Sequence, residues 1–336
     1  MSVVFATDHI HPDAARRLGE VARFAVVAWR EGPDYADALA GADVVIVRNR
    51  LPAELFARAP RLRAVIRHGA GLDMIPLAEA AAHGVLVANV PAVNAAAVAE
   101  FAIGQMLALA RGLAATEAQL RTVSWEAGRV RAAAGGQLGG ATVAIVGMGA
   151  VGRRLAAICA QGFGMRVLGV HPARTGGADA SCTYVALEQA LAATDFLVLA
   201  CPLNAATHHL IGAAQLALMK PGAFLVNVAR GAVVESAALA RALAEGRIAG
   251  AALDVFETTP LPAGDPLFDL PSARLTPHVA GISAQSLLAM SMGAAEQAIE
   301  VLAGRYPAHW VNREAHHAIQ SRWAALPADP LRGPGG

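Results

Sequence analysis

The feature that most constrains the fold is a glycine-rich turn near the middle of the chain, where residues 143–152 read Val-Ala-Ile-Val-Gly-Met-Gly-Ala-Val-Gly. A short apolar run enters the turn, and a helical pattern beginning with two arginines leaves it. In a strand–turn–helix of this kind Gly147 permits the tight bend, Gly149 lets backbone N–H groups approach a pyrophosphate, and Gly152 lets the helix pack on the strand. Because this nucleotide-binding turn lies mid-chain, we expect another folded unit before it.

Composition narrows the classes of protein that could contain such a turn. A chain of 336 residues is long enough for about two domains. The formal net charge is +1 and aromatic residues make up 5%, so we expect no nucleic-acid-binding surface. Hydrophobic residues reach 55%, but the charge-free run 132–152 contains seven glycines and the turn itself, which favours loop and buried strand over a membrane span.

The N-terminal residues and the cysteines indicate the cellular compartment of the protein. Residues 2–8 contain no basic segment and are typical of a first β-strand, not of a signal peptide. Cys159, Cys182 and Cys201 are too scattered for a disulfide framework or a metal site. We therefore expect a cytoplasmic protein with no bound metal and no membrane association.

Apolar runs alternate with helical patterns along most of the chain. The predicted strands are 3–6, 44–47, 64–66 and 85–88 in the first part, and 167–170, 196–200, 223–228, 250–254 and 274–276 after the turn. Such alternation predicts an α/β fold with two doubly wound parallel sheets. We expect the long apolar helix over 95–113 to bridge the two units and the helix over 284–302 to return to the first.

Three stretches after the turn carry the chemistry. They read Asn227-Val-Ala-Arg230-Gly231, Gly250-Ala-Ala-Leu-Asp254-Val-Phe-Glu257 and Thr276-Pro-His278-Val-Ala-Gly281. With Arg67-His-Gly-Ala-Gly71 earlier in the chain, their order and spacing resemble the D-isomer-specific 2-hydroxyacid dehydrogenase family. The resemblance implies a flavodoxin-like substrate domain (1–97 and 290–320), a Rossmann dinucleotide-binding domain (98–289), and a remaining tail (321–336) that we expect to be disordered.

The resemblance also implies the reaction and the residues that perform it. The family interconverts a small 2-oxo acid and its D-2-hydroxy acid with NAD(P)H. Arg230 matches the arginine that anchors the substrate carboxylate, a task suited to a planar guanidinium. His278 matches the general acid/base that gives a proton to the carbonyl oxygen or takes one from the hydroxyl.

Substrate contacts are expected in the first half of the chain. Ala70 and Gly71 correspond to the loop whose backbone amides hold the substrate carboxylate. Arg48 and Arg50 stand where members acting on phosphoglycerate carry arginines, and two exposed loop arginines are an equally good interpretation.

The cofactor contacts that the resemblance implies follow the ends of predicted strands. They are Gly147, Gly149, Ala150, Val151, Gly152, His171, Arg174, Thr175, Cys201, Pro202, Thr207, Val228, Ala229, Asp254 and Gly281. The family usually forms homodimers through the cofactor domain, so a homodimer is expected here.

One departure from the family pattern concerns the third catalytic position. The family glutamate that pairs with the histidine corresponds to Thr259 in this chain. A hydroxyl can orient an imidazole but supplies no negative charge, so we predict that protonated His278 is less favoured than in relatives and that reduction prefers acid pH. Glu257 lies two residues away, and in an extended segment its side chain should point elsewhere.

A second departure concerns the cofactor. At the end of the strand 167–170, a member preferring NAD has an aspartate that binds the ribose hydroxyls. This chain has His171 there, followed by Arg174 and Thr175, which can bind a 2′-phosphate. The sequence therefore favours NADP over NAD.

Taken together, these residues predict an NAD(P)H-dependent reductase of a small 2-oxo acid such as glyoxylate or hydroxypyruvate. A phosphoglycerate dehydrogenase is one alternative, supported by Arg48 and Arg50. A catalytically weakened NAD(P)-binding sensor, similar to corepressors of this fold, is another, although retention of both Arg230 and His278 argues against it.

Overall fold

A computed structural model of the chain describes residues 1–30, 32 and 34–326. The chain divides into two compact units. Unit 1 comprises residues 1–94 and the chain from Ser283 onward, and unit 2 comprises Ala95–Ile282. The divisions fall beside the first turns of two long helices, α5 (Ala95–Arg111) and α12 (Ala284–Leu302). The sequence-based expectation places the boundaries at 97/98 and 289/290.

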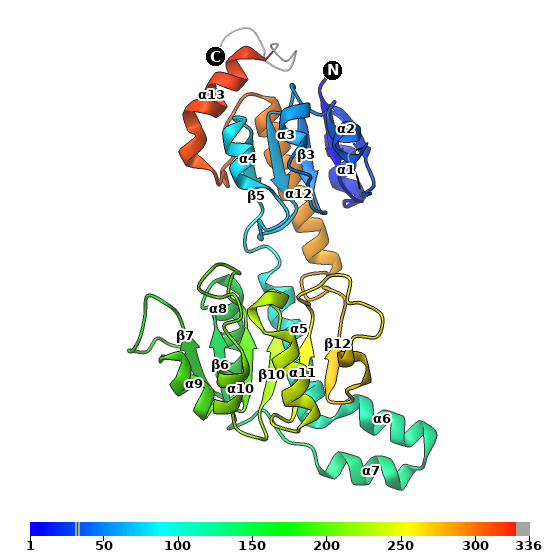
Figure 1. Ribbon diagram of the computed structural model, residues 1–336, viewed down its shortest axis with the longest axis vertical. Coiled ribbons are helices and arrows are strands. Elements are labelled where there is room, and N and C mark those ends of the chain that lie inside the picture. The colour runs from blue at the N-terminus through cyan, green and yellow to red at the C-terminus, as the bar shows by residue number, and fades with distance from the viewer. Residues whose placement is uncertain (31, 33, 327–336) are drawn as a thin grey trace. The chain divides into compact units, whose positions relative to one another are not determined.

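Unit 1 is built around a parallel sheet with the strand order β2-β1-β3-β4-β5 (Figure 1). Its strands are β1 (Val3–Ala6), β2 (Arg23–Val26), β3 (Val44–Val47), β4 (Ala64–Arg67) and β5 (Leu86–Asn89). Its helices are α1 (Pro12–Gly19), α2 (Asp34–Leu39), α3 (Leu55–Arg58), α4 (Leu77–Ala82), α12 and α13 (His316–Ala325). This strand order is that of the flavodoxin-like doubly wound fold, as the sequence predicted.

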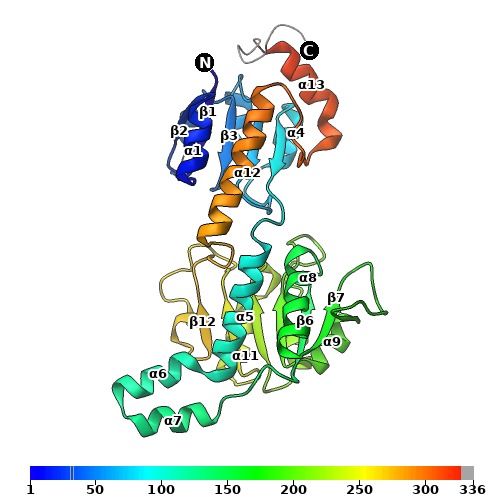
Figure 2. The same ribbon diagram turned by 180° about the vertical axis from the view of Figure 1, so that it is seen from behind.

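Side chains alternate between the two faces of the unit 1 sheet because the strand period is two. Val44 and Ile46 pack in one core with α1 and α12, which cover the same face in Figure 2. Val45 and Val47 pack in the other core with α2 and α3. Both faces are therefore covered, which explains why these strands are apolar throughout.

Unit 2 contains a larger parallel sheet with the strand order β12-β11-β10-β9-β6-β7-β8. Its strands are β6 (Thr142–Val146), β7 (Arg166–Val170), β8 (Thr183–Tyr184), β9 (Phe196–Leu199), β10 (Phe224–Asn227), β11 (Gly250–Leu253) and β12 (Ala273–Leu275). Its helices are α5, α6 (Leu113–Thr122), α7 (Trp125–Ala133), α8 (Ala150–Ala157), α9 (Leu187–Ala193), α10 (Ala213–Leu218) and α11 (Ser236–Ala244). Counted from β6, this is the Rossmann order, with the direction of winding reversing between β6 and β9.

The sequence did not predict several elements. The edge strands β2 and β8 are partly exposed or very short, and therefore lack a continuous apolar run. Helices α6 and α7 form a hairpin that extends away from the unit 2 sheet (Figures 1 and 2). The expectation of a disordered tail from residue 321 is wrong for 321–325, because α13 continues to Ala325 and buries Trp323. Residues 327–336 of that tail lie outside the described residues.

The apolar helices raise the question of a membrane. Among the described residues, no single helix is long and apolar enough to cross one. Helices α5 and α6 reach the required length only as a pair that is bent by 53°.

Candidate active site

In both units the expected site residues follow the carboxyl ends of strands. In unit 2, the glycine turn follows β6, His171 follows β7, and Cys201 comes shortly after β9. Arg230, Asp254 and His278 follow β10, β11 and β12, which are consecutive in the sheet. Parallel strands place these segments along one edge, where doubly wound folds bind their ligands.

The glycine turn has the geometry that the pyrophosphate argument requires. Gly147 has φ 99°, and a Cβ there would lie 2.5 Å from the backbone nitrogen of Cys201. A Cβ at Gly152 would lie 2.0 Å from the carbonyl oxygen of Gly147. At Gly149, by contrast, a Cβ would meet no protein atom within 4 Å, so the protein leaves open the space that a cofactor would occupy. These residues fit a dinucleotide at the N-terminus of α8, whose first residues are Ala150 and Val151.

The segment after β7 contains a cation, Arg174, and an acidic residue that is hydrogen-bonded to its neighbours. The Arg174 guanidinium lies 3.9 Å from the ring centroid of Tyr184, a cation–π arrangement. Asp179 is the acidic residue of this segment, and its oxygens accept hydrogen bonds from the backbone of Ser181 and Cys182 and from the Tyr184 hydroxyl. Hydrogen bonding by Ser181 is the main reason that the pKa of Asp179 lies below its usual value.

The loop after β9 is braced by its own side chains. Thr207 Oγ1 donates to the Pro202 carbonyl oxygen at 2.7 Å and accepts from the Asn204 backbone at 2.8 Å. Cys201 is buried beside Gly147. Burial raises the pKa of the Cys201 thiol, so this cysteine serves packing and not nucleophilic chemistry.

Arg230 is positioned by two features that the sequence did not explain. The buried Asn227 side chain donates to the Arg230 carbonyl oxygen at 3.0 Å and accepts from the Ala229 backbone at 3.0 Å. A Cβ at Gly231 would lie 1.9 Å from the carbonyl carbon of Phe256, so only glycine lets this loop pass the segment after β11. Asn227 therefore acts as a positioning residue, and its place at the start of the Asn-Val-Ala-Arg-Gly motif is the signal that could have revealed it.

His278 lies on a loop that Asp254 holds. Its backbone adopts a left-handed conformation with φ 57°, which is uncommon for a residue with a side chain. The Asp254 carboxylate is 2% exposed and accepts hydrogen bonds from Thr276 Oγ1, Val279 N and Ala280 N at 2.7, 2.9 and 2.8 Å. We expected Asp254 to contact the cofactor, and its observed hydrogen bonds fix the loop from Thr276 to Ala280.

The two candidate residues after Asp254 differ in their environment. Thr259 is exposed, and its hydroxyl lies 3.4 Å from the Phe256 carbonyl oxygen. Glu257 Oε1 lies 2.6 Å from Nε2 of His209. The negative charge nearest in sequence to position 259 is therefore paired with His209.

In unit 1, the loop that contains Ala70 and Gly71 follows β4. Nε of Arg67 donates to the Gly71 carbonyl oxygen at 3.1 Å, and the Asn89 amide donates to that of Ala70 at 2.8 Å. Sequence reasoning did not assign a role to Arg67 or Asn89. Both side chains brace this loop through its carbonyl oxygens.

Arg48, which follows β3, and His68, which follows β4, belong to the same unit. The Arg48 guanidinium donates to the His9 carbonyl oxygen and lies 3.8 Å from the Asp8 carboxylate. His68 is buried, with Nε2 2.8 Å from the hydroxyl of Ser291 in α12. Burial, followed by the charges of Arg48 and Arg67, lowers the pKa of His68 to about 3, so this imidazole is neutral.

The remaining expected cofactor residues lie in the same unit 2 segments. Val228 and Ala229 precede Arg230, Thr175 follows Arg174, and Gly281 follows Ala280. The structure thus gathers the cofactor residues with Arg230, Thr259 and His278 in unit 2. It places Arg48, Ala70 and Gly71 in unit 1.

Comparison with known proteins gives consistent matches. Residues 103–280 match the family described as D-isomer specific 2-hydroxyacid dehydrogenase, NAD binding domain. A glyoxylate reductase of Korarchaeum cryptofilum is 39% identical over 274 residues, covering 81% of this chain and 82% of that protein. A D-3-phosphoglycerate dehydrogenase of Methanocaldococcus jannaschii is 33% identical over 320 residues, covering 93% of this chain but 60% of that protein.

A solved structure extends the likeness to three dimensions. It is that of an NADPH-dependent glyoxylate/hydroxypyruvate reductase of Sinorhizobium meliloti in complex with NADP and malonate. The TM-score is 0.80 at 30% sequence identity, covering 93% of this chain and 97% of that chain.

Each of the two α/β units contains a parallel sheet, and the dinucleotide turn lies where the larger sheet reverses its winding. Together with the matched family, this arrangement defines a nicotinamide-dependent dehydrogenase. The chain belongs to the D-isomer-specific 2-hydroxyacid dehydrogenase family. It uses a nicotinamide cofactor to interconvert a 2-oxo acid and its D-2-hydroxy acid.

Proposed function

We propose that this enzyme is an NADPH-dependent reductase of a small 2-oxo acid such as glyoxylate or hydroxypyruvate. The observation that carries the proposal is the order of three loops along one sheet edge, with Arg230 after β10, the Asp254 segment after β11 and His278 after β12. A cation for a carboxylate and an acid for a carbonyl oxygen are what reduction of a 2-oxo acid requires. The similarity to the glyoxylate reductase of Korarchaeum cryptofilum supports the substrate class.

In the proposed mechanism each of these residues has one task. Arg230 holds the substrate carboxylate with its guanidinium, and Asn227 keeps the Arg230 backbone in place. A reduced nicotinamide bound along this sheet edge would supply the hydride that the carbonyl carbon needs. His278 gives a proton to the carbonyl oxygen, and the reverse reaction returns that proton to the imidazole. Thr259, at the family glutamate position, can supply a hydroxyl dipole but no charge.

The preference for NADP is supported by the segment after β7. Arg174 is held over Tyr184, and the Asp179 carboxylate accepts from Ser181, Cys182 and Tyr184, so a 2′-phosphate would meet the Arg174 cation. Fluorescence titration with NADPH and NADH tests this preference. We expect Arg174→Ala to weaken NADPH binding by about tenfold or more, since a charged hydrogen bond contributes roughly 1.5–3 kcal/mol, and to leave NADH binding within twofold. Tighter binding of NADH by the wild-type enzyme would contradict the preference.

The substrate is tested by steady-state rates with glyoxylate, hydroxypyruvate and 3-phosphohydroxypyruvate. We expect the two unphosphorylated acids to be reduced with the higher kcat/KM. The Arg48 guanidinium already interacts with the His9 carbonyl and the Asp8 carboxylate, which disfavours a phosphate partner. Cofactor binding without turnover of any 2-oxo acid would instead favour the sensor.

We propose that the enzyme is a homodimer in which the α6–α7 hairpin contacts a second copy. No residue of α6 is buried, and Trp125 and Val130 of α7 are 63% and 75% exposed. Such exposed apolar side chains on a projecting hairpin are typical of an interface. Light scattering should give twice the mass of the chain, and Trp125→Glu with Val130→Glu should halve it; a monomeric wild-type protein would contradict the proposal.

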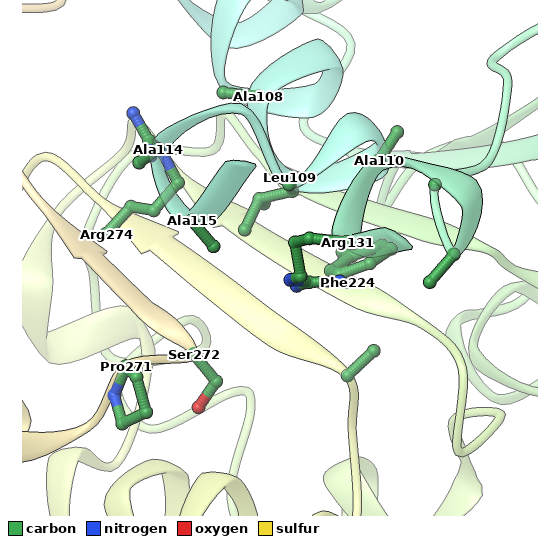
Figure 3. A pocket seen from close by; sticks show the side chains of 14 residues that line it. Ala108, Leu109, Ala110, Ala114, Ala115, Arg131, Phe224, Pro271, Ser272 and Arg274 are labelled. Carbon is green, nitrogen blue, oxygen red and sulfur yellow. The ribbon is translucent and has the colours of Figure 1, made fainter. Parts of the chain in front are cut away.

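A cavity of about 240 Å³ lies at the base of this hairpin (Figure 3). It is lined by Leu109 of α5, Arg131 of α7, Phe224 of β10 and Arg274 of β12. In the proposed dimer, a second copy would cover these groups.

We also propose a cytoplasmic location, which is supported by the three cysteines being buried and free.

A further inference from the structure

A cluster of metal-ligating side chains lies in unit 2, and the proposed mechanism does not use it. It contains His208 and His209, which directly follow Thr207 in the loop after β9, and Glu257, from the segment after β11. One ligand atom from each residue lies within 4.8 Å of the other two. Two segments distant in sequence thus bring together two imidazoles and one carboxylate.

We propose that His208, His209 and Glu257 form a binding site for a single transition-metal dication of the Zn²⁺ type. Two histidines and one glutamate are a common ligand set for zinc, with the fourth position taken by water. The imidazole nitrogens also suit Co²⁺, Ni²⁺ and Cu²⁺, whereas Mg²⁺ and Ca²⁺ prefer oxygen ligands.

The distances can adapt to a metal with small side-chain movements. Zinc bonds of about 2.1 Å at tetrahedral angles place neighbouring ligand atoms about 3.4 Å apart. Nε2 of His209 lies 2.6 Å from Oε1 of Glu257, so these two atoms must separate by less than an ångström to admit the ion. The ring centroids of His208 and His209 lie 4.0 Å apart, and the two rings are tilted by 34° relative to each other. All three residues are wholly or partly exposed, which leaves their rotamers room to adjust.

The surrounding structure prepares two of the three ligands. The His209 backbone has φ 51° and donates to the Ala232 carbonyl oxygen at 2.8 Å, which directs this residue toward the Glu257 segment. Glu257 Oε2 accepts a hydrogen bond from the Ser236 backbone at 3.3 Å, an outer contact that orients the carboxylate.

Adjacent histidines alone do not create such a group. His316 and His317 are also adjacent and exposed, yet among the described residues the cluster at Glu257 is the group that brings three ligands together. That second pair therefore provides a matched control. A metal in the proposed site would join the loop that carries Thr207 to the segment that carries Thr259, and so restrain both.

The test is calorimetric titration of ZnCl₂ into the full chain without an affinity tag, cofactor or substrate. We expect saturable binding of one ion per chain. Loss of an outer-shell partner costs about 10–100-fold in metal affinity, so loss of a ligand in His208→Gln should weaken binding by at least about tenfold. His208 is exposed and its change leaves the His209–Glu257 pair in place, so folding should be unaffected. Glu257→Gln, which keeps an acceptor for Ser236, should weaken binding similarly, and His317→Gln should leave it within twofold.

Titration with Co²⁺ gives an independent readout, because its visible absorption reports the number and geometry of ligands. We expect intense four-coordinate bands in the wild-type protein and in His317→Gln, and weak bands in His208→Gln. The proposal is overturned if the wild-type chain shows no saturable site for Zn²⁺. It is equally overturned if His208→Gln and Glu257→Gln bind Zn²⁺ as tightly as the wild-type chain.

Discussion

Replacing the buried Asp254 carboxylate by an amide should release the loop that carries His278. Asp254 Oδ1 accepts from Thr276 Oγ1 and Val279 N, and Oδ2 accepts from Ala280 N. In Asp254→Asn the amide oxygen can keep the two donors on one side. Its NH₂ group then faces the Ala280 N–H, so two donors oppose each other in a site that is 2% exposed.

The expected cost follows from these contacts. One charge-assisted hydrogen bond is lost, and one buried N–H is left without an acceptor, which together cost roughly 2–4 kcal/mol. Relief of the burial cost of the carboxylate offsets part of this, so we expect unit 2 to lose about 2 kcal/mol of stability. Displacement of His278 by about 1 Å should lower kcat/KM by about 100-fold.

The assay combines urea unfolding, followed by circular dichroism, with steady-state reduction of glyoxylate. Asp179→Asn is the matched control, because Asp179 also accepts three hydrogen bonds but is exposed to water. Water can replace the lost interactions there, so the free energy of unfolding of Asp179→Asn should differ from the wild-type value by less than about 1 kcal/mol. The positioning role of Asp254 is refuted if the free energy of unfolding of Asp254→Asn lies within about 0.5 kcal/mol of the wild-type value and its kcat/KM lies within about twofold.

Three further substitutions test other parts of the site. Folding lowers the pKa of His68 from 6.5 to about 3, so the stability that the folded state gains from a neutral imidazole here is fully present above pH 6.5. It is lost at up to about 1.4 kcal/mol per pH unit as the pH falls toward 3, and urea midpoints of His68→Gln should lack this slope. Gly231→Ala should abolish turnover, measured as kcat, because its Cβ would overlap Phe256; wild-type turnover would show that the loop can move aside. Thr259→Glu should move the alkaline limb of the pH profile of kcat/KM for reduction to higher pH, because reduction needs protonated His278, and an unmoved limb would exclude a role for the missing charge.

The sequence by itself determined the fold class and the order of the two units. Strands such as 44–47 are apolar at every position because both faces of a parallel sheet are covered, and this pattern is legible without tertiary contacts. The roles of Gly147 and Gly152 could also be predicted from the sequence, since the close approach of other backbone atoms excludes any side chain at both positions. The motifs around Arg230 and His278 identified the family for the same reason: they combine local backbone demands with a fixed order along the chain.

Only the tertiary structure decided the partners of individual side chains. Glu257 and His209 are 48 residues apart, and their 2.6 Å contact depends on how the loops after β9 and β11 meet. Asp254 received a cofactor role from the resemblance, whereas its three hydrogen bonds to the loop of His278 became visible only in the fold. The α6–α7 hairpin escaped prediction because its helices bury almost nothing within their own unit, so their sequences lack an amphipathic pattern. Local backbone requirements are written into consecutive residues, whereas contacts between distant loops arise only when the sheet has placed those loops along one edge.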